Sequence, residues 1–404
     1  MKEYHIERLG HQGDGIAPGP IFAQMALPGE IVSGDIDGDR LKNLKILKSS
    51  SDRVSPICRH YKTCGGCQLQ HASDKFVAGW KVGVVRQSLA AQGIQTNFKP
   101  IITSPPESRR RAVFSAKRTK KGSMAGFHAR ASHAIVEIQE CPLLDPKLFR
   151  AKQISAELAA LAGSRKGELN ITATHSASGL DISVQGGKLL DGPLMSLLAQ
   201  AAERLQIARL TWSGETISTR ASPEQVFGNV PVVPPPGAFL QATTHGEMAL
   251  LEAVALAVSA GGRGIDLFSG CGTFTLPTAA LAQVHAVESD ANMISALEVG
   301  WKNVPGLKRV TTEVRDLFRN PIIAEDLGYD FAIVDPPRAG AEAQVKELGQ
   351  SKIKEIAFVS CNPITFARDA ALLIKNNYTL EWVQVIDQFR WSSHIELVAR
   401  FTRL

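Results

Sequence analysis

The residues best suited to chemistry stand in three short motifs in the last third of the chain. Asp335-Pro-Pro-Arg338 and Ser-Cys361-Asn-Pro each follow an apolar, strand-like run, and His-Ile-Glu396 lies farther along. In an open α/β sheet, ligands bind at the carboxyl ends of the strands. We therefore expect a thiol, an arginine and two carboxylates to meet in one crevice. This arrangement suits nucleophilic addition of a cysteine to an electron-poor ring.

Each of these residues also has a plainer interpretation. Cys361 could be a small buried core residue, although its place after a strand and before Asn-Pro favours a nucleophile. Glu396 could be a solvated strand residue. We expect His394 to pack or to position its loop, and Cys271, which sits in a glycine turn, to be structural.

A glycine turn predicts a cofactor pocket. Gly270 and Gly272 stand between a strand-like run and a helix, where the backbone can approach a ligand closely. The third glycine of a dinucleotide site is missing, so a nucleoside with an amino-acid tail, such as S-adenosylmethionine, fits better than a pyrophosphate. Glu288, at the end of the next strand, could accept the ribose hydroxyls, and Asp316 could reach the adenine amine. A Rossmann-like site for another nucleotide is the alternative.

Four cysteines require a joint explanation. Cys58, Cys64 and Cys67 are close in sequence, and Cys141 lies far downstream before a proline. Four thiolates suit a tetrahedral zinc ion or an iron–sulfur cluster. Only one short Cys-x2-Cys knuckle is present, which favours a 4Fe-4S cluster over zinc. A disulfide framework is not expected in a chain of intracellular character.

The elements that must position these residues fall into three predicted units. Residues 1–52 combine glycine-rich turns with short alternating runs, typical of a small OB-like β-barrel. Residues 53–236 mix strands and helices as a central α+β domain, which a proline-rich break ends. Residues 237–404 alternate strands and helices as a Rossmann-like, doubly wound parallel sheet and close with an antiparallel hairpin.

The charge distribution points to a phosphate-bearing polymer. The 404 residues carry a formal net charge of +6, and seven of the thirteen residues from Arg109 to Lys121 are basic. Such a stripe is typical of RNA-binding surfaces, with a solvated strand face as the alternative. No apolar stretch is long enough to cross a membrane, and no signal peptide is evident. We expect a cytoplasmic monomer.

Together these motifs resemble those of the RNA uridine carbon-5 (5-methyluridine) methyltransferase family, of its iron–sulfur-containing, ribosomal-RNA type. The resemblance spans nearly the whole chain. It implies a shortened RNA-binding TRAM domain at the start and an S-adenosylmethionine-dependent methyltransferase domain at the end. It implies 4Fe-4S ligands at Cys58, Cys64, Cys67 and Cys141. Besides Gly270 of the glycine turn, the expected cofactor contacts are Gln241, Phe268, Thr273, Glu288, Asp316 and Asp335.

The resemblance also implies a reaction. Cys361 would add to carbon-6 of a flipped-out uracil, and Glu396 would remove the carbon-5 proton after methyl transfer. The expected substrate is 23S ribosomal RNA, with transfer RNA as the alternative. Two other classes stay open. An enzyme that methylates an exocyclic amine would not need Cys361, and a non-catalytic iron–sulfur RNA-binding protein would not bind the cofactor.

Overall fold

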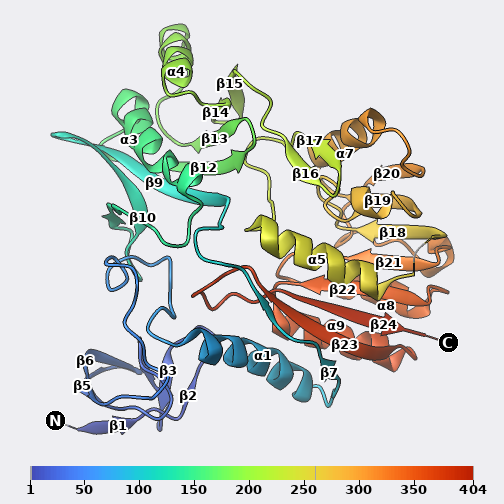
Figure 1. Cartoon of the computed structure of the whole chain (residues 1–404), viewed down its shortest axis with the longest axis horizontal. Helices are drawn as coiled ribbons and strands as arrows, with labels where there is room; N and C mark the ends of the chain where they lie inside the picture. The colour runs from blue at the N-terminus through green and yellow to red at the C-terminus, as the bar shows by residue number, and fades with distance from the viewer. Residues whose placement is uncertain (1, 260, 404) are drawn as a thin grey trace.

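The part of the chain with the predicted chemistry folds around one sheet (Figure 1). The computed structural model describes residues 2–259 and 261–403. The strand order is β20-β19-β18-β21-β22-β24-β23-β7, and β8 pairs with β23. Strands β18 to β22 are parallel, whereas β24 is antiparallel to both β22 and β23. The strands are β18 (Arg263–Leu267), β19 (Gln283–Glu288), β20 (Val310–Val314), β21 (Phe331–Val334), β22 (Glu355–Ser360), β23 (Thr379–Asp387) and β24 (Leu397–Thr402).

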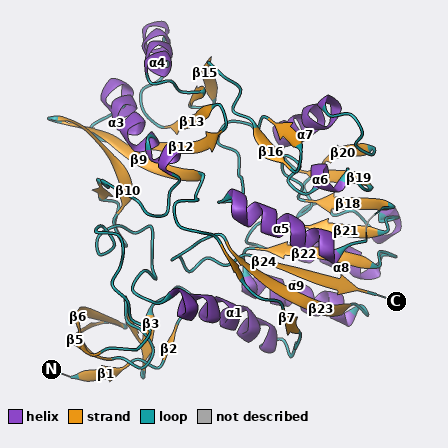
Figure 2. Ribbon diagram, in the orientation of Figure 1, coloured by secondary structure: helices purple, strands orange, loops and turns teal. Residues whose placement is uncertain are grey.

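Helices cover both faces of this sheet, as its apolar strands require. Along β22, Ile356 and Phe358 pack with α8 and α9, whereas Ala357 and Val359 pack with α5. Figure 2 shows α5 on one side of the sheet and α8 and α9 on the other. The α/β class and the terminal hairpin are therefore confirmed. The helices are α5 (Thr244–Ala257), α6 (Thr275–Thr278), α7 (Ala291–Asn303), α8 (Glu342–Gln350) and α9 (Pro363–Lys375), with a 3-10 turn at Ala324–Asp326.

The middle of the chain forms a second sheet of order β11-β10-β9-β12-β13-β14-β15. It is antiparallel except between β13 and β14, and α3 and α4 pack against it. The hairpin β16–β17 follows and packs with α7 of the C-terminal unit. The elements are β9 (Arg111–Thr119), β10 (Gly122–His128), β11 (Ile135–Val136), α2 (Pro146–Phe149), α3 (Ala151–Ala162), β12 (Leu169–Ser176), β13 (Gly179–Gln185), α4 (Gly192–Arg204), β14 (Arg209–Trp212), β15 (Glu215–Thr219), β16 (Gln225–Phe227) and β17 (Val230–Val232).

The N-terminal segment forms a third sheet, of order β1-β5-β6-β4-β3-β2, around a small apolar core. Because β1 and β2 are its edges, closure into the predicted barrel is not confirmed, and the TRAM assignment stays a prediction. Residues 1, 260 and 404, which fall within the predicted units, lie outside the described residues. The strands are β1 (Glu3–His5), β2 (Arg8–Leu9), β3 (Gly15–Ala17), β4 (Ile21–Ala23), β5 (Ile31–Asp37) and β6 (Arg40–Lys48).

One segment connects these units. Helix α1 (Asp74–Ala90) begins where the Ser73 side chain accepts a hydrogen bond from the Phe76 amide, and it packs against α9. Strands β7 (Asn97–Phe98) and β8 (Ile102–Thr103) then pair with β23. Strands β7 and β8 thus extend the C-terminal sheet, and α1 packs against its covering helix, although the predicted division assigns all three elements to the central domain. Among the described residues, every helix is too short or too polar to cross a bilayer.

Candidate active site

Strand pairing brings the predicted nucleophile and the predicted base together. Ser360, the last residue of β22, pairs with Leu397, the first residue of β24. Cys361 and Glu396 are the next residues on these two antiparallel strands, so both lie at the carboxyl edge of the parallel strands. Asp335 follows β21, the other neighbour of β22. The structure therefore gathers a thiol and two carboxylates in one place, as the sequence predicts.

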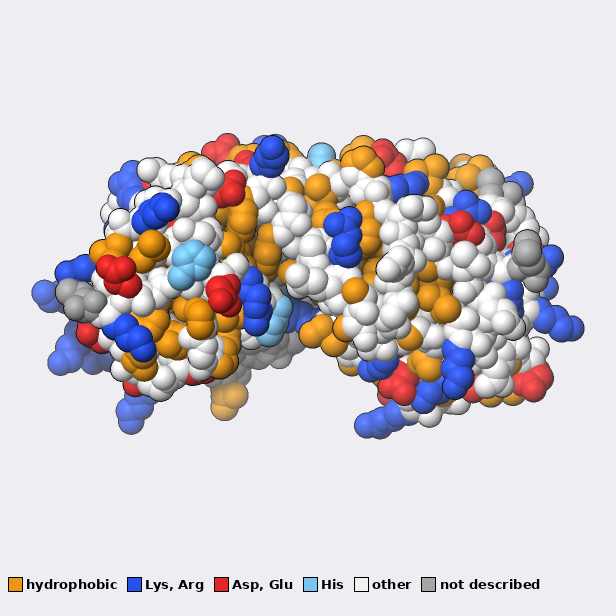
Figure 3. Space-filling view, turned by 90° about the horizontal axis from the view of Figure 1, so that it is seen from below, with side chains coloured by type: hydrophobic (Ala, Val, Ile, Leu, Met, Phe, Trp, Pro, Cys, Tyr) orange, Lys and Arg blue, Asp and Glu red, His pale blue; other side chains and the backbone are white. Residues whose placement is uncertain are grey.

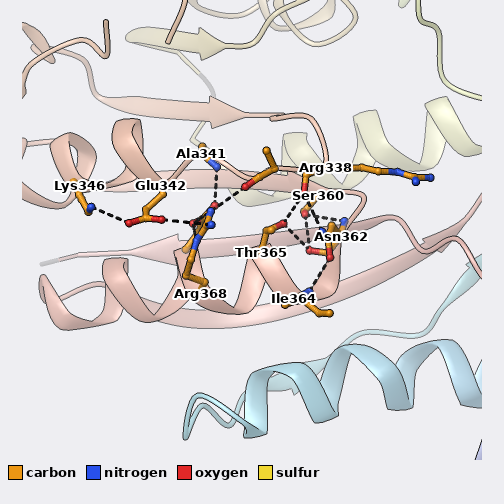
Figure 4. A network of polar contacts seen from close by, with 11 residues as sticks. Arg338, Ala341, Glu342, Lys346, Ser360, Asn362, Ile364, Thr365 and Arg368 are labelled. Atoms are coloured by element: carbon orange, nitrogen blue, oxygen red, sulfur yellow. Dashed lines mark hydrogen bonds and ion pairs between the residues drawn. The ribbon is translucent and has the colours of Figure 1, made fainter. Parts of the chain in front are cut away.

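The loop that carries Cys361 is fixed by the first turn of α9 (Figure 4). Asn362 caps this helix, because its Oδ1 accepts a hydrogen bond from the Ile364 amide at 3.1 Å. Its Nδ2 donates to the carbonyl oxygen of Arg338 at 2.9 Å, and Thr365 Oγ1 donates to the same oxygen at 3.2 Å. The helix N-terminus thus holds the Asp-Pro-Pro-Arg turn and the cysteine loop together.

Glu396 is buried beside an amide that the sequence did not reveal. Gln388, just after β23, donates from Nε2 to Glu396 Oε2 at 3.2 Å, and both side chains are buried. Burial raises the pKa of Glu396 well above 4.5 and the charge of Asp335 raises it further, whereas Gln388 and Arg338 lower it. A carboxyl group with a raised pKa suits a general base that works near neutral pH.

The surroundings of Cys361 strongly oppose ionisation of its thiol. Burial raises the pKa of Cys361 to about 12, with further contributions from the charges of Glu396 and Asp335, while Arg338 lowers it. Burial also raises the pKa of Asp335 to about 7. The thiol is therefore protonated at neutral pH in this state. Of the neighbouring charges, that of Arg338 favours the thiolate.

Arg338 is oriented by His394. Its Nη2 donates to His394 Nδ1 at 3.0 Å. Burial lowers the pKa of His394 to about 4, and the charges of Arg338, Lys81 and Arg109 lower it as well. The imidazole is therefore neutral at physiological pH and can accept this hydrogen bond. This contact agrees with the positioning role expected for His394.

The glycine turn after β18 meets Glu288. The Gly270 amide donates to Glu288 Oε2 at 3.1 Å, and the Ser289 amide donates to Oε1 at 2.6 Å. Gly272 has φ +94°, and a Cβ atom there would lie 2.9 Å from Leu276, so the turn requires glycine. The turn and the carboxylate are thus already in place, in the arrangement by which Rossmann-like folds bind a ribose.

The other predicted cofactor contacts surround this turn. Phe268 has φ +66°, and its ring centroid lies 5.6 Å from that of Phe318. Asp316 is exposed, and its Oδ1 accepts a hydrogen bond from the Phe318 amide at 2.9 Å. Thr273 is partly buried within the turn. Phe318 was not predicted, although an aromatic residue in the loop after a strand is a usable sequence signal. The ligand contacts of these residues stay predictions.

The arginines at the start of the basic stripe hold the segment that ends in Gln241. Arg110 Nε donates to the Gln241 carbonyl oxygen at 3.2 Å, and Arg110 forms an ion pair with Glu247 at 2.5 Å. Arg111 Nε donates to the Ala238 carbonyl oxygen at 3.1 Å. Arg110 is only 6% exposed, so its assignment to an RNA-binding surface is wrong. Four other basic residues of the stripe are partly or fully exposed on the β9–β10 hairpin: Lys117, Arg118, Lys120 and Lys121.

The four cysteines predicted as cluster ligands lie near one another. The Gln139 amide donates to His60 Nε2 at 3.0 Å, which sets the segments of Cys58 and Cys141 side by side, and Cys64 and Cys141 pack against the same apolar core. Burial raises the pKa of Cys67 to about 12. All four are unpaired thiols, a donor set that suits iron–sulfur chemistry. Within the described residues, however, no group of three or more His, Cys, Asp or Glu side chains is arranged to hold a metal ion. The geometry therefore does not confirm the 4Fe-4S prediction.

A cleft of about 1210 Å³ leads to Cys361. Its walls come from the N-terminal sheet, α1, the end of β10 and the active-site loops. Arg8, Arg40, Arg130 and Arg338 are among the lining residues. The space-filling view from below shows a recess between two lobes of the molecule (Figure 3). This cleft exceeds the usual volume of a small-molecule pocket and offers cations to a polyanionic ligand.

Comparisons with known proteins agree with this site. A family model described as tRNA (Uracil-5-)-methyltransferase matches residues 235–403. An uncharacterized RNA methyltransferase of Brucella suis is 42% identical over 403 residues, which cover 98% of this chain and 97% of that protein. The 23S rRNA (uracil(1939)-C(5))-methyltransferase RlmD of Halomonas elongata is 30% identical, over 98% of this chain and 88% of that protein.

A solved structure shares the fold. The tRNA (uracil-54, C5)-methyltransferase of Pyrococcus abyssi, in complex with S-adenosyl-L-homocysteine, superimposes with a TM-score of 0.76 at 23% identity, covering 99% of this chain and 100% of that one. The two chains thus share one fold over their whole length. The chain belongs to the RNA (uracil-5-)-methyltransferase family. Membership of this family does not favour either alternative left open by the sequence, an enzyme that methylates an exocyclic amine or a non-catalytic RNA-binding protein.

Proposed function

We propose that this enzyme methylates uridine through a transient covalent bond between Cys361 and carbon-6 of uracil. The pairing of Ser360 with Leu397, which sets the thiol beside Glu396, carries the proposal. Attack by the Cys361 thiolate makes carbon-5 nucleophilic, and the bound cofactor supplies the methyl group. Glu396 then takes the proton from carbon-5, the carbon-5–carbon-6 double bond re-forms, and the Cys361 thiolate is expelled.

A transcript containing 5-fluorouridine tests this mechanism, because Glu396 cannot remove fluorine as it removes a proton. We expect wild-type enzyme and RNA to form one species that resists denaturation. Cys361→Ala should form none, whereas Glu396→Gln should accumulate the adduct even with ordinary uridine. Cys271→Ala is the matched cysteine control, since Cys271 is buried in the core. Normal methylation of uridine by Cys361→Ala would refute the mechanism.

We propose ribosomal RNA as the substrate. A 23S rRNA methyltransferase of Halomonas elongata is 30% identical over 98% of the chain, which supports this choice. The family model and the Pyrococcus abyssi structure are instead named for transfer RNA, which is the second candidate. Mass-spectrometric mapping of 5-methyluridine in both RNAs, from cells with and without this protein, separates the two. Loss confined to transfer RNA would contradict our choice.

We further propose that Cys58, Cys64, Cys67 and Cys141 hold a 4Fe-4S cluster as a structural support. The contacts that set the segments of Cys58 and Cys141 side by side and the chemistry of four thiols support this proposal. Anaerobically purified protein should show iron, labile sulfide and the broad visible absorbance of a cluster, which serine variants should lose. Stoichiometric zinc without iron would identify the alternative. The exposed lysines of the β9–β10 hairpin and the TRAM-like N-terminal sheet would contact the RNA backbone.

A further inference from the structure

The side-chain amide of Gln388 joins two parts of the site. Its Nε2 donates to Gln241 Oε1 at 2.5 Å and to Glu396 Oε2 at 3.2 Å, while its Oε1 accepts a hydrogen bond from the Ala242 amide at 2.7 Å. Reversing the amide would set its oxygen against two acceptors and its NH2 group against a donor. The environment therefore fixes the orientation of Gln388.

The fold also reserves space for this side chain. Gly246 lies in the first turn of α5, and a Cβ atom there would lie 2.6 Å from Gln388 Cβ, 2.9 Å from Oγ1 of the capping Thr243 and 3.3 Å from Gln388 Oε1. Glycine in a helix costs stability relative to alanine, so its presence here serves the close approach of Gln388. Gln241, Gln388 and Glu396 are each at most 3% exposed, and buried amides of this kind rigidify the groups that they bind.

We propose that Gln388 is a positioning residue that orients the Glu396 carboxylate and the Gln241 amide together, and so couples the proton-abstraction step to the cofactor pocket. This inference rests on the proposed function, in which Glu396 is the base. Because Gln241 Oε1 already accepts a hydrogen bond from Gln388, the Nε2 of Gln241 is left as a donor for the cofactor. Because it donates to Glu396, it also favours the ionised carboxylate that accepts the proton.

The balance of charges around Glu396 gives this inference a pH signature. The charged and titratable groups that face Glu396 are Asp335 and Arg338, which follow β21, and Cys361, which follows β22. Burial and the charge of Asp335 disfavour ionisation of Glu396, and Gln388 and Arg338 favour it. Removal of the Gln388 donor should therefore raise the pKa of Glu396 further, and a higher pH should restore the base.

Gln388→Met keeps the length of the side chain and removes its donors. We expect covalent capture on 5-fluorouridine RNA to persist. With ordinary RNA, release of 5-methyluridine should slow about 10- to 100-fold at neutral pH, as expected for loss of a hydrogen bond to a charged group. The pH profile of release should move to higher pH, and the KM for S-adenosylmethionine should rise. Gln384→Met is the control, because Gln384 lies on β23 but donates to the Pro100 carbonyl oxygen at 3.0 Å.

The possible outcomes separate the two proposals. Failure of the wild-type enzyme to form an adduct would refute the proposed function. An adduct that Gln388→Met resolves at the wild-type rate, with an unshifted pH profile, would overturn this inference alone. If Gln388→Met does not fold, Gly246→Ala displaces the same amide without removing it and should shift the release profile in the same direction. Wild-type release and pH dependence in Gly246→Ala would then reject the inference.

Discussion

Replacing Lys81 with methionine should destabilise the fold and loosen the loop that carries Glu396. Lys81 is fully buried in α1, where its Nζ donates to Asp387 Oδ1 at 2.6 Å and to the carbonyl oxygens of Phe389 at 3.1 Å and His394 at 2.9 Å. Removing one partner of a buried ion pair costs about 3–5 kcal/mol. Two carbonyl groups also lose a donor, at about 1 kcal/mol each. The expected total is about 5–7 kcal/mol.

Urea denaturation with matched variants measures this effect. Lys75→Met changes an exposed lysine of the same helix and should lie within about 0.5 kcal/mol of wild type. Adding Asp387→Asn to Lys81→Met removes the uncompensated charge and should recover most of the loss. If the free energy of unfolding of Lys81→Met lies within about 1 kcal/mol of that of wild type, the Lys81–Asp387 ion pair does not stabilise this loop as inferred.

Three further predictions concern the cofactor, pH and RNA. Glu288→Gln should weaken S-adenosylmethionine binding about tenfold by calorimetry, because its carboxylate accepts the Gly270 amide; unchanged affinity would contradict a cofactor role. Burial raises the pKa of Asp266 from 3.8 to about 7, so its contribution to stability is fully present below about pH 4, declines as pH rises from about 4 to 7, and is lost above about 7. The thermal midpoint of Asp266→Asn should lack that decline, and parallel curves for the two proteins would contradict this. Replacing both Lys120 and Lys121 with alanine should reduce the slope of log K for RNA binding against log salt concentration by about 0.7–0.9 per lost phosphate contact. Binding titrations at several salt concentrations measure this slope, and an unchanged slope would exclude both lysines from the interface.

The positions of Cys361 and Glu396 could be predicted because local patterns determine them. Each apolar run predicts a strand, and each motif follows or precedes one, so the topology of the sheet decides which residues meet. The predicted terminal hairpin sets β24 antiparallel, and pairing with β22 then places Glu396 beside Cys361. The same argument predicts that the glycine turn after β18 lies beside Glu288 at the end of β19, because these two strands are parallel neighbours.

Gln388 and Arg110 could not be assigned from the sequence, since their roles depend on contacts between distant segments. Gln388 binds Gln241, far away along the chain, and needs the space left by Gly246. Arg110 looks like its basic neighbours until its burial against Glu247 is known. Charge is visible in a sequence, but solvent exposure is not.

The two short strands that pair with β23 make the catalytic sheet dependent on residues made much earlier in synthesis. Asn97–Phe98 and Ile102–Thr103 occupy an edge that a fragment starting near residue 237 would leave bare. Unpaired strand edges recruit other chains, so such a fragment should self-associate rather than work as an autonomous enzyme. During translation, this sheet likewise cannot be completed until β23 and β24 emerge, because β7 and β8, made in about the first quarter of the chain, have no strand to pair with before then.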